Sequence, residues 1–211
     1  MGDGAESLSV ALGEDERVMP ASPPSNAALL RAVAASRAAW NHAERPATIE
    51  PAGPGEESVW SFPRPPRVES VAARVVVAAG TRVVAETRDA LRVVETAGAP
   101  CYYLPAADCD ASVLRSTGRW TVCEWKGVAC GYDVLAGDRR YASAAWTYPD
   151  PLDDLGCGFA RIAGRFAFYA HELICTIDGE RVRPQPGGFY GGWVTARLRG
   201  PIKGVPGSGR W

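Results

Sequence analysis

Hydrophobic and polar positions divide the chain into three stretches with different periods. Residues 1–24 show no hydrophobic period, and their acidic, Pro- and Gly-containing composition predicts a disordered tail because it buries too little surface to offset ordering entropy. From Ser25, apolar residues recur at helical spacing through Trp40 among alanines. We therefore expect an N-terminal helix and a Pro/Gly linker within residues 25–56, followed by a single domain over residues 57–211.

In that domain the hydrophobic period shortens to two, which is typical of strands. The pattern predicts a hairpin from Val71–Ala79 and Arg82–Glu86, and a second from Arg119–Trp125 and Val128–Leu135 about Lys126-Gly127. Residues 92–96 fit either a strand or a short helix, and short helices are expected at 106–114 and 159–163. Further strands are expected at 102–104, 139–146, 165–169 and 173–177.

Short strands with frequent turns and no βα alternation predict a mainly β fold. We expect a compact antiparallel β domain with one or two short helices, to which the N-terminal helix is added. The tail, residues 184–211, is rich in Gly and Pro and also in aromatic residues, which predicts an ordered strap rather than a free linker.

Charge and length exclude several classes of function. The 211 residues include 23 Lys and Arg against 24 Asp and Glu, a formal charge of −1, so a nucleic-acid partner is not expected. No run approaches the roughly 18 consecutive apolar residues of a membrane span, so no membrane partner is expected. The acidic N-terminus lacks the features of a secretory signal, and we expect a cytoplasmic protein.

Several longer motifs are specific enough to suggest a family. They are Glu57–Trp60 with Pro63–Glu69, Tyr102–Pro105, Cys123–Gly127, Ala145–Pro151, Ala167–Tyr169, and Asp178–Glu180 leading into Pro184–Trp193. Together they resemble a bacterial family, domain of unknown function 427, in its longer actinobacterial form. The resemblance implies a compact β fold with a pocket and brings with it a nucleotidyltransferase-like label. Five cysteines, all except Cys123, depart from the family's pattern.

The chemistry of nucleotidyl transfer is not visible in the residues. That reaction needs carboxylates that hold magnesium, usually beside a Gly-rich phosphate loop. The D-x-D motif, Asp108-Cys109-Asp110, lies in a predicted helix, where carboxylates two apart do not share a face. The glycines at 204–209 have no helix behind them. We therefore expect metal-independent chemistry, with no metal and no cofactor.

The cysteines have two interpretations. A two-residue turn at Lys126-Gly127 would place Cys123 directly opposite Cys130, either as buried reduced thiols or as a redox pair. With only His42 and His171 as imidazoles and no C-x-x-C spacing, a zinc site is not expected.

The second hairpin also carries the candidate catalytic residues. A lysine beside a tight glycine turn, Lys126, is either a solvated surface residue or an ammonium that neutralises a substrate carboxylate, phosphate or developing oxyanion. Glu124 is expected to be its ion-pair partner or a general base.

Aromatic residues supply candidate ligand-binding positions. They are explained either by core packing or by the wall of a ligand cavity. The set comprises Tyr102, Tyr103, Trp125, Tyr132, Trp146 and Tyr148.

The sequence thus predicts a small-molecule-binding β domain that acts as an acid–base enzyme on an anionic or carbonyl-bearing metabolite. The alternative is a non-catalytic module for a sugar or nucleotide-like ligand, in which Lys126 supplies only charge. A third interpretation is an interaction scaffold that forms a homodimer through the N-terminal helix; the same helix could instead dock on its own domain.

Overall fold

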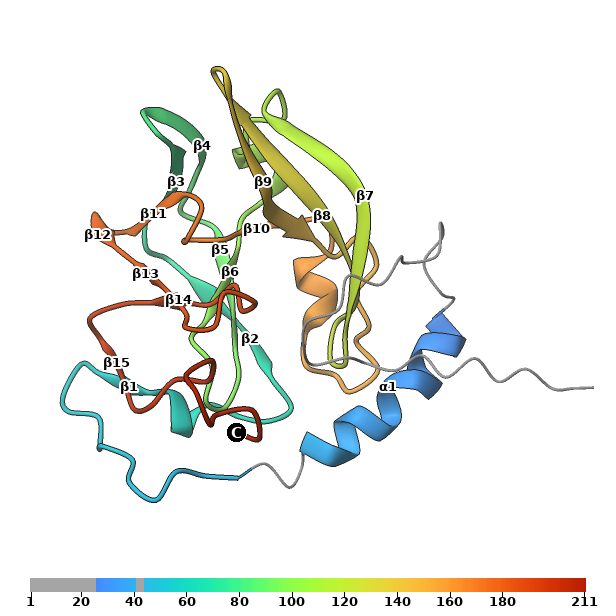
Figure 1. Ribbon diagram of the computed structural model, residues 1–211, viewed down its shortest axis with the longest axis vertical. Helices are drawn as coiled ribbons and strands as arrows, with labels where there is room; N and C mark the ends of the chain where they lie inside the picture. The colour runs from blue at the N-terminus through green and yellow to red at the C-terminus, as the bar shows by residue number, and fades with distance from the viewer. Residues whose placement is uncertain (1–25, 41–43) are drawn as a thin grey trace, which may run out of the picture.

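The computed structural model describes residues 26–40 and 44–211. The predicted tail and His42 lie outside these residues. Within the part of the chain that the structure describes, no helix has the length and apolar content of a membrane span. The rest of the description confirms a mainly β fold with antiparallel sheets and one α-helix (Figure 1).

Alternating burial along Val75–Ala79 produces the first antiparallel sheet. Val75, Val77 and Ala79 are buried, whereas the residues between them are half-buried, as expected for a strand with one face on the core. The strand order is β12-β11-β3-β4, with β3 at Val75–Ala79, β4 at Arg82–Thr87, β11 at Ile174–Ile177 and β12 at Glu180–Arg181. The predicted first hairpin is confirmed, although Val71 belongs to another strand.

The second antiparallel sheet contains the long hairpin. Its order is β10-β9-β8-β7, with β7 at Leu114–Cys123, β8 at Gly127–Ala136, β9 at Arg139–Thr147 and β10 at Phe166–Phe168. The predicted register is wrong: Cys123 pairs with Gly127, and Trp120 pairs with Cys130. Three residues rather than two form the turn, which shifts the register. Cys123 and Cys130 are therefore not opposite each other, and all six thiols are free.

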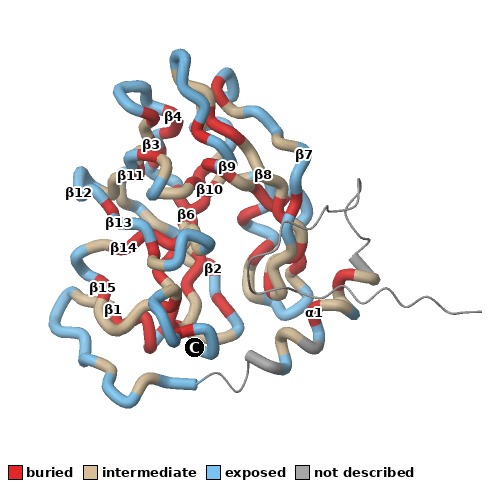
Figure 2. The backbone as a smooth tube through the Cα atoms, viewed as in Figure 1, coloured by how far each residue is buried: buried red, intermediate tan, exposed pale blue. Residues whose placement is uncertain are grey.

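A third sheet closes the other side of the core. Its order is β2-β5-β6, with β2 at Arg67–Val71, β5 at Ala90–Val94 and β6 at Cys101–Tyr103. The stretch that fitted either a strand or a helix, residues 92–96, begins as the end of β5. Buried residues from all three sheets concentrate in the interior of the molecule (Figure 2).

The C-terminal strap is ordered, as predicted. Its β14 (Trp193–Val194) pairs with β13 (Arg183–Pro184), and its β15 (Leu198–Arg199) pairs with β1 (Glu57–Ser58). The Trp193 side chain is fully buried, and its Nε1 donates a hydrogen bond of 2.9 Å to the carbonyl oxygen of Phe168.

The predicted helix over residues 106–114 is wrong. Only a single 3-10 turn forms there, η2 at Ala106–Asp108. The backbone N–H of Asp110 instead donates to the Val84 carbonyl, which draws the segment onto β4. The second short helix is also a 3-10 turn, η3 at Phe159–Ile162, and a third, η1 at Val59–Ser61, follows β1.

The N-terminal helix, α1 at Asn26–Trp40, lies beside the turn between β7 and β8 (Figure 1). Its Leu29 and Val33 side chains are buried and pack with Leu152 of the same chain. The helix therefore docks on its own domain, and this contact places its last turns next to the hairpin that carries Lys126.

Candidate functional site

The turn between β7 and β8 consists of Glu124, Trp125 and Lys126. Gly127 follows with φ at +85°, the left-handed conformation that completes a three-residue hairpin loop. A Cβ at Gly127 would lie 3.0 Å from Leu152 Cγ and 3.2 Å from Leu29 Cδ2. Glycine is required here both for the backbone conformation and for the close approach of α1.

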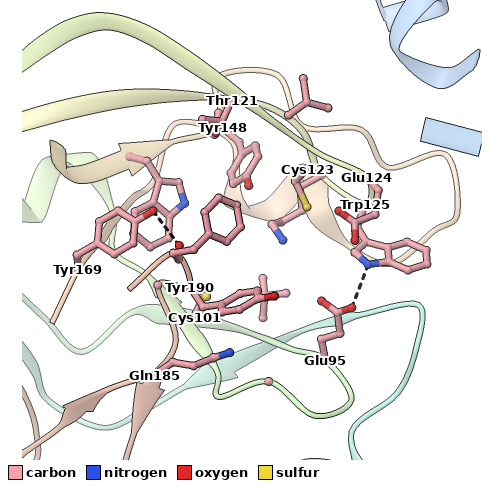
Figure 3. A pocket seen from close by; sticks show the side chains of 18 of the residues that line it. Glu95, Cys101, Thr121, Cys123, Glu124, Trp125, Tyr148, Tyr169, Gln185 and Tyr190 are labelled. Atoms are coloured by element: carbon pink, nitrogen blue, oxygen red, sulfur yellow. Dashed lines mark hydrogen bonds between the residues drawn. The ribbon is translucent and has the colours of Figure 1, made fainter. Parts of the chain in front are cut away.

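This turn forms one side of a cavity of about 310 Å³. The opposite side comes from β5, β6 and the loop between them, and further walls come from β9 and the C-terminal strap. Figure 3 shows the side chains of these separate segments pointing into one space. The cavity thus joins residues that are distant in the sequence.

Lys126 is the cation at the centre of the candidate site. Its Nζ lies 5.6 Å from the ring centroid of Tyr148 and 5.9 Å from that of Phe159. No carboxylate among the described residues forms an ion pair with this ammonium, and no described residue accepts a hydrogen bond from it. Burial disfavours its charge, whereas the ionised forms of neighbouring acidic groups, first Cys123 and then Tyr148, raise the pKa of Lys126 above its ordinary value.

The weak acids around Lys126 are neutral at neutral pH. Burial raises the pKa of the Tyr148 phenol and that of the Cys123 thiol, and it raises the pKa of Cys101 to about 11. Burial also raises the pKa of Tyr103, whose hydroxyl group has no hydrogen-bond partner among the described residues. Neutral thiols and phenols do not neutralise the Lys126 ammonium, so its positive charge is available to an anionic ligand.

Glu95 is a candidate base that sequence reasoning missed. Its Oε1 accepts a hydrogen bond of 3.1 Å from Trp125 Nε1 (Figure 3). The same oxygen lies 3.3 Å from Arg64 Nε. Burial raises the pKa of Glu95, an effect that the charges of Lys126 and Arg64 oppose. The only sequence signal is a carboxylate directly after a buried valine-rich strand.

Lys203 also lines the cavity and was missed. Its Nζ donates a hydrogen bond of 2.9 Å to the Trp211 carbonyl oxygen and lies 5.9 Å from the Tyr190 ring centroid. Burial lowers the pKa of Lys203 to about 8. With Arg64, Arg119 and Lys126, it gives the lining four cationic side chains against the carboxylates of Glu95 and Glu124.

The strap reaches the cavity at Gly191. A Cβ at this position would lie 2.0 Å from Trp146 Cη2, so only glycine lets the backbone lie against the indole. The Trp146 ring lies 4.6 Å from the Tyr169 ring, and the Tyr169 hydroxyl donates a hydrogen bond of 3.4 Å to the Phe189 carbonyl oxygen. The strap therefore forms part of an aromatic wall.

The structure brings most of the sequence-predicted site residues together. Lys126 and Glu124 line the cavity, as do Tyr103, Trp125, Trp146 and Tyr148.

Two of the predicted aromatic residues lie outside the lining. Tyr102 stacks on Trp193 in the core with a centroid distance of 5.0 Å, because adjacent strand residues face opposite sides. Tyr132 packs edge-on against Phe166 at 5.0 Å.

The carboxylate of Asp110, from the D-x-D motif that nucleotidyl transfer would use to hold magnesium, contacts other side chains instead. Asp110 forms an ion pair of 2.6 Å with Arg82 and accepts hydrogen bonds from Ser112. Within residues 26–40 and 44–211, no three His, Cys, Asp or Glu side chains gather in a group that could hold a metal ion.

Comparison with known proteins places the chain in a family but gives it no activity. No curated protein matches the chain at a significant level. The family model NTP_transf_9, described as a domain of unknown function (DUF427), matches residues 67–183, which is more than half of the chain. This chain therefore belongs to the DUF427 family.

Proposed function

We propose that the protein binds a small anionic or carbonyl-bearing metabolite in this cavity and catalyses an acid–base reaction on it. The observation that carries the proposal is the Lys126 ammonium, which has no ion-pair partner among the described residues and lies in an aromatic-walled cavity. An ammonium in such a site stabilises negative charge on an oxygen more strongly than it would in water.

Two carboxylates supply candidates for the base. Glu95 is held by Arg64 and Trp125, and its raised pKa makes it a stronger proton acceptor than an ordinary glutamate. Glu124 lines the cavity from the same turn as Lys126. In the proposed reaction a carboxylate takes a proton from the substrate, and the electron pair moves onto the oxygen beside Lys126.

The aromatic wall favours a second candidate function, a non-catalytic module that binds a sugar or nucleotide-like ligand. The rings of Trp146 and Tyr169 lie together at 4.6 Å, and such surfaces bind flat or ring-shaped ligands by stacking. This candidate requires ligand binding through Lys126 but no turnover.

Metabolite capture with mass-spectrometric detection tests the proposal, with Lys126→Ala as the control protein. A lost charge-assisted hydrogen bond is worth about 1.5–3 kcal/mol, so we expect captured ligand to fall roughly tenfold or more. Lys126→Arg should restore binding only in part because a planar guanidinium directs its donors differently.

Equal capture by the wild type and Lys126→Ala would exclude this site. If the captured compound binds through Lys126 but is recovered unchanged after incubation with the wild type, the binding-module function is favoured. Both variants should unfold at nearly the wild-type temperature, which separates a lost contact from a lost fold.

A further inference from the structure

Tyr148 presents an unused hydrogen-bonding group beside Lys126. Its side chain is 5% exposed, and Figure 3 shows its hydroxyl group pointing into the cavity. The hydroxyl makes no hydrogen bond to a described residue. Because this hydroxyl faces the cavity, a ligand oxygen placed there can accept its hydrogen bond. Tyr148 and Lys126 therefore form the polar end of the cavity.

Of the four cationic and two acidic side chains that line the cavity, Lys126 is the cation beside Tyr148, and it supplies one positive charge at this end. The thiols and phenols around Lys126 are neutral at neutral pH because burial raises their pKa values. The Arg64 cation lies against Glu95, and Lys203 is bonded to the Trp211 carbonyl oxygen. A carboxylate carries a single charge and fits this end, whereas a phosphate monoester carries about −1.5 to −2 at neutral pH.

Aromatic side chains line the rest of the cavity. The Trp146 ring meets the Tyr103 ring edge-on at 6.4 Å and lies 4.6 Å from the Tyr169 ring. The cavity volume of about 310 Å³ lies at the lower end of the range for small-molecule pockets. Aromatic rings pack favourably on one another in offset or edge-on arrangements.

We infer that the ligand is a small aromatic carboxylate, whose carboxylate accepts hydrogen bonds from the Lys126 ammonium and the Tyr148 hydroxyl while its ring packs on the aromatic wall. This inference rests on the proposed function and specifies its ligand class.

Titration calorimetry on the full chain tests the inference with benzoate and cinnamate as probes. Benzamide lacks the negative charge, cyclohexanecarboxylate lacks the aromatic ring, and phenyl phosphate replaces the carboxylate by a phosphate. Each compound therefore tests one feature of the ligand. We expect saturable binding of benzoate or cinnamate and at least tenfold weaker binding of the other three.

Tyr148→Phe and Tyr132→Phe form the matched pair of variants. Both remove one phenolic hydroxyl, but Tyr132 lies outside the cavity lining. We expect Tyr148→Phe to weaken benzoate binding about fivefold or more without lowering the melting temperature, because its hydroxyl makes no bond to be lost. Tyr132→Phe should bind as the wild type does. If Tyr148→Phe does not fold, Lys126→Met and the benzamide comparison decide the question.

Unchanged benzoate binding by Tyr148→Phe would overturn the assigned role of Tyr148. Tighter binding of phenyl phosphate or cyclohexanecarboxylate than of benzoate would overturn the ligand class. If no aromatic carboxylate binds but capture still yields a Lys126-dependent metabolite, this inference fails and the proposed function stands. If capture is independent of Lys126, both fail.

Discussion

Lys203 carries a buried charge whose cost depends on pH. Burial lowers its pKa to about 8 in the folded chain, against 10.5 for the ordinary ammonium. Below pH 8 the ammonium is charged in both states, and folding bears the full cost of burying it. Between pH 8 and 10.5 the folded chain has lost this proton while the unfolded chain keeps it, so this contribution to stability rises with pH.

We therefore predict that Lys203→Met changes the pH dependence of unfolding. The free energy of unfolding of the wild type, minus that of the variant, should increase from pH 7.5 to pH 10. Urea unfolding of both proteins at these two pH values measures the difference. A difference that stays constant with pH would show that folding does not lower the pKa of Lys203.

Cys101 is predicted to react slowly in the folded protein. Burial raises its pKa to about 11, so roughly one thiol in a few thousand is ionised at pH 7.5, and the thiolate is the reactive form. Alkylation by iodoacetamide, followed at Cys101 by mass spectrometry, should be slow in the native chain and fast in urea. The Lys126 charge lowers the pKa of Cys101, so Lys126→Met should slow native alkylation further. Equal rates in the native and unfolded chains would contradict this.

The sequence indicates some of the site's residues and not others. Lys126 and Glu124 stand out because a charged pair beside a glycine turn is visible in one segment. Glu95 and Lys203 cannot be predicted from one segment, because each reaches the cavity only when chain segments distant in the sequence come together. Alternation along β6 explains why one of two adjacent tyrosines, Tyr103, lines the cavity and the other does not.

Among the elements, α1 holds the turn that carries Lys126. Arg37 Nε donates a hydrogen bond of 2.6 Å to the Glu124 carbonyl oxygen, and its NH2 donates one of 3.3 Å to that of Trp125. The same guanidinium forms a bidentate ion pair with Asp154 at 2.6 and 3.0 Å, and it holds the pKa of Asp154 below its ordinary value. One side chain thus joins the helix, the turn and the following loop.

We predict that Arg37→Ala weakens ligand binding although Arg37 does not line the cavity. The lost bonds should lower the free energy of unfolding by about 1–3 kcal/mol and loosen the turn. Arg31→Ala is the matched control, because Arg31 is exposed on the same helix. Thermal unfolding and metabolite capture should change for Arg37→Ala only. Identical capture by both variants would show that the helix does not position the turn.

The hydrophobic pattern predicts the presence of helices and strands better than it predicts the register and packing between them. The helix and both hairpins follow from their periods. The register of the second hairpin does not, because the three-residue turn depends on Leu29 and Leu152 packing against Gly127. The segment after Ala106 has local helix propensity, but its backbone bonds to β4 instead.

For the molecule as a whole, we expect that the family-matched region does not fold alone. Residues 67–183 exclude the fully buried Trp193, and removing a buried tryptophan side chain alone costs about 3–5 kcal/mol. We predict that a fragment of residues 67–183 shows no cooperative thermal unfolding, whereas residues 26–211 do. Circular dichroism during heating distinguishes them. A cooperative transition of the fragment would show that the strap is dispensable for folding.

Through the Arg37 contacts, docking of α1 is coupled to ligand binding in the cavity. If docking of α1 raises the affinity for a ligand by some factor, ligand binding must favour the docked helix by the same factor. A protein that bound the apolar face of α1 would then lower the affinity of the cavity for the metabolite. Saturating metabolite would in turn lower the affinity of α1 for that protein. Such reciprocity would make α1, which lies outside the family-matched region, an allosteric input to a site built mostly within it.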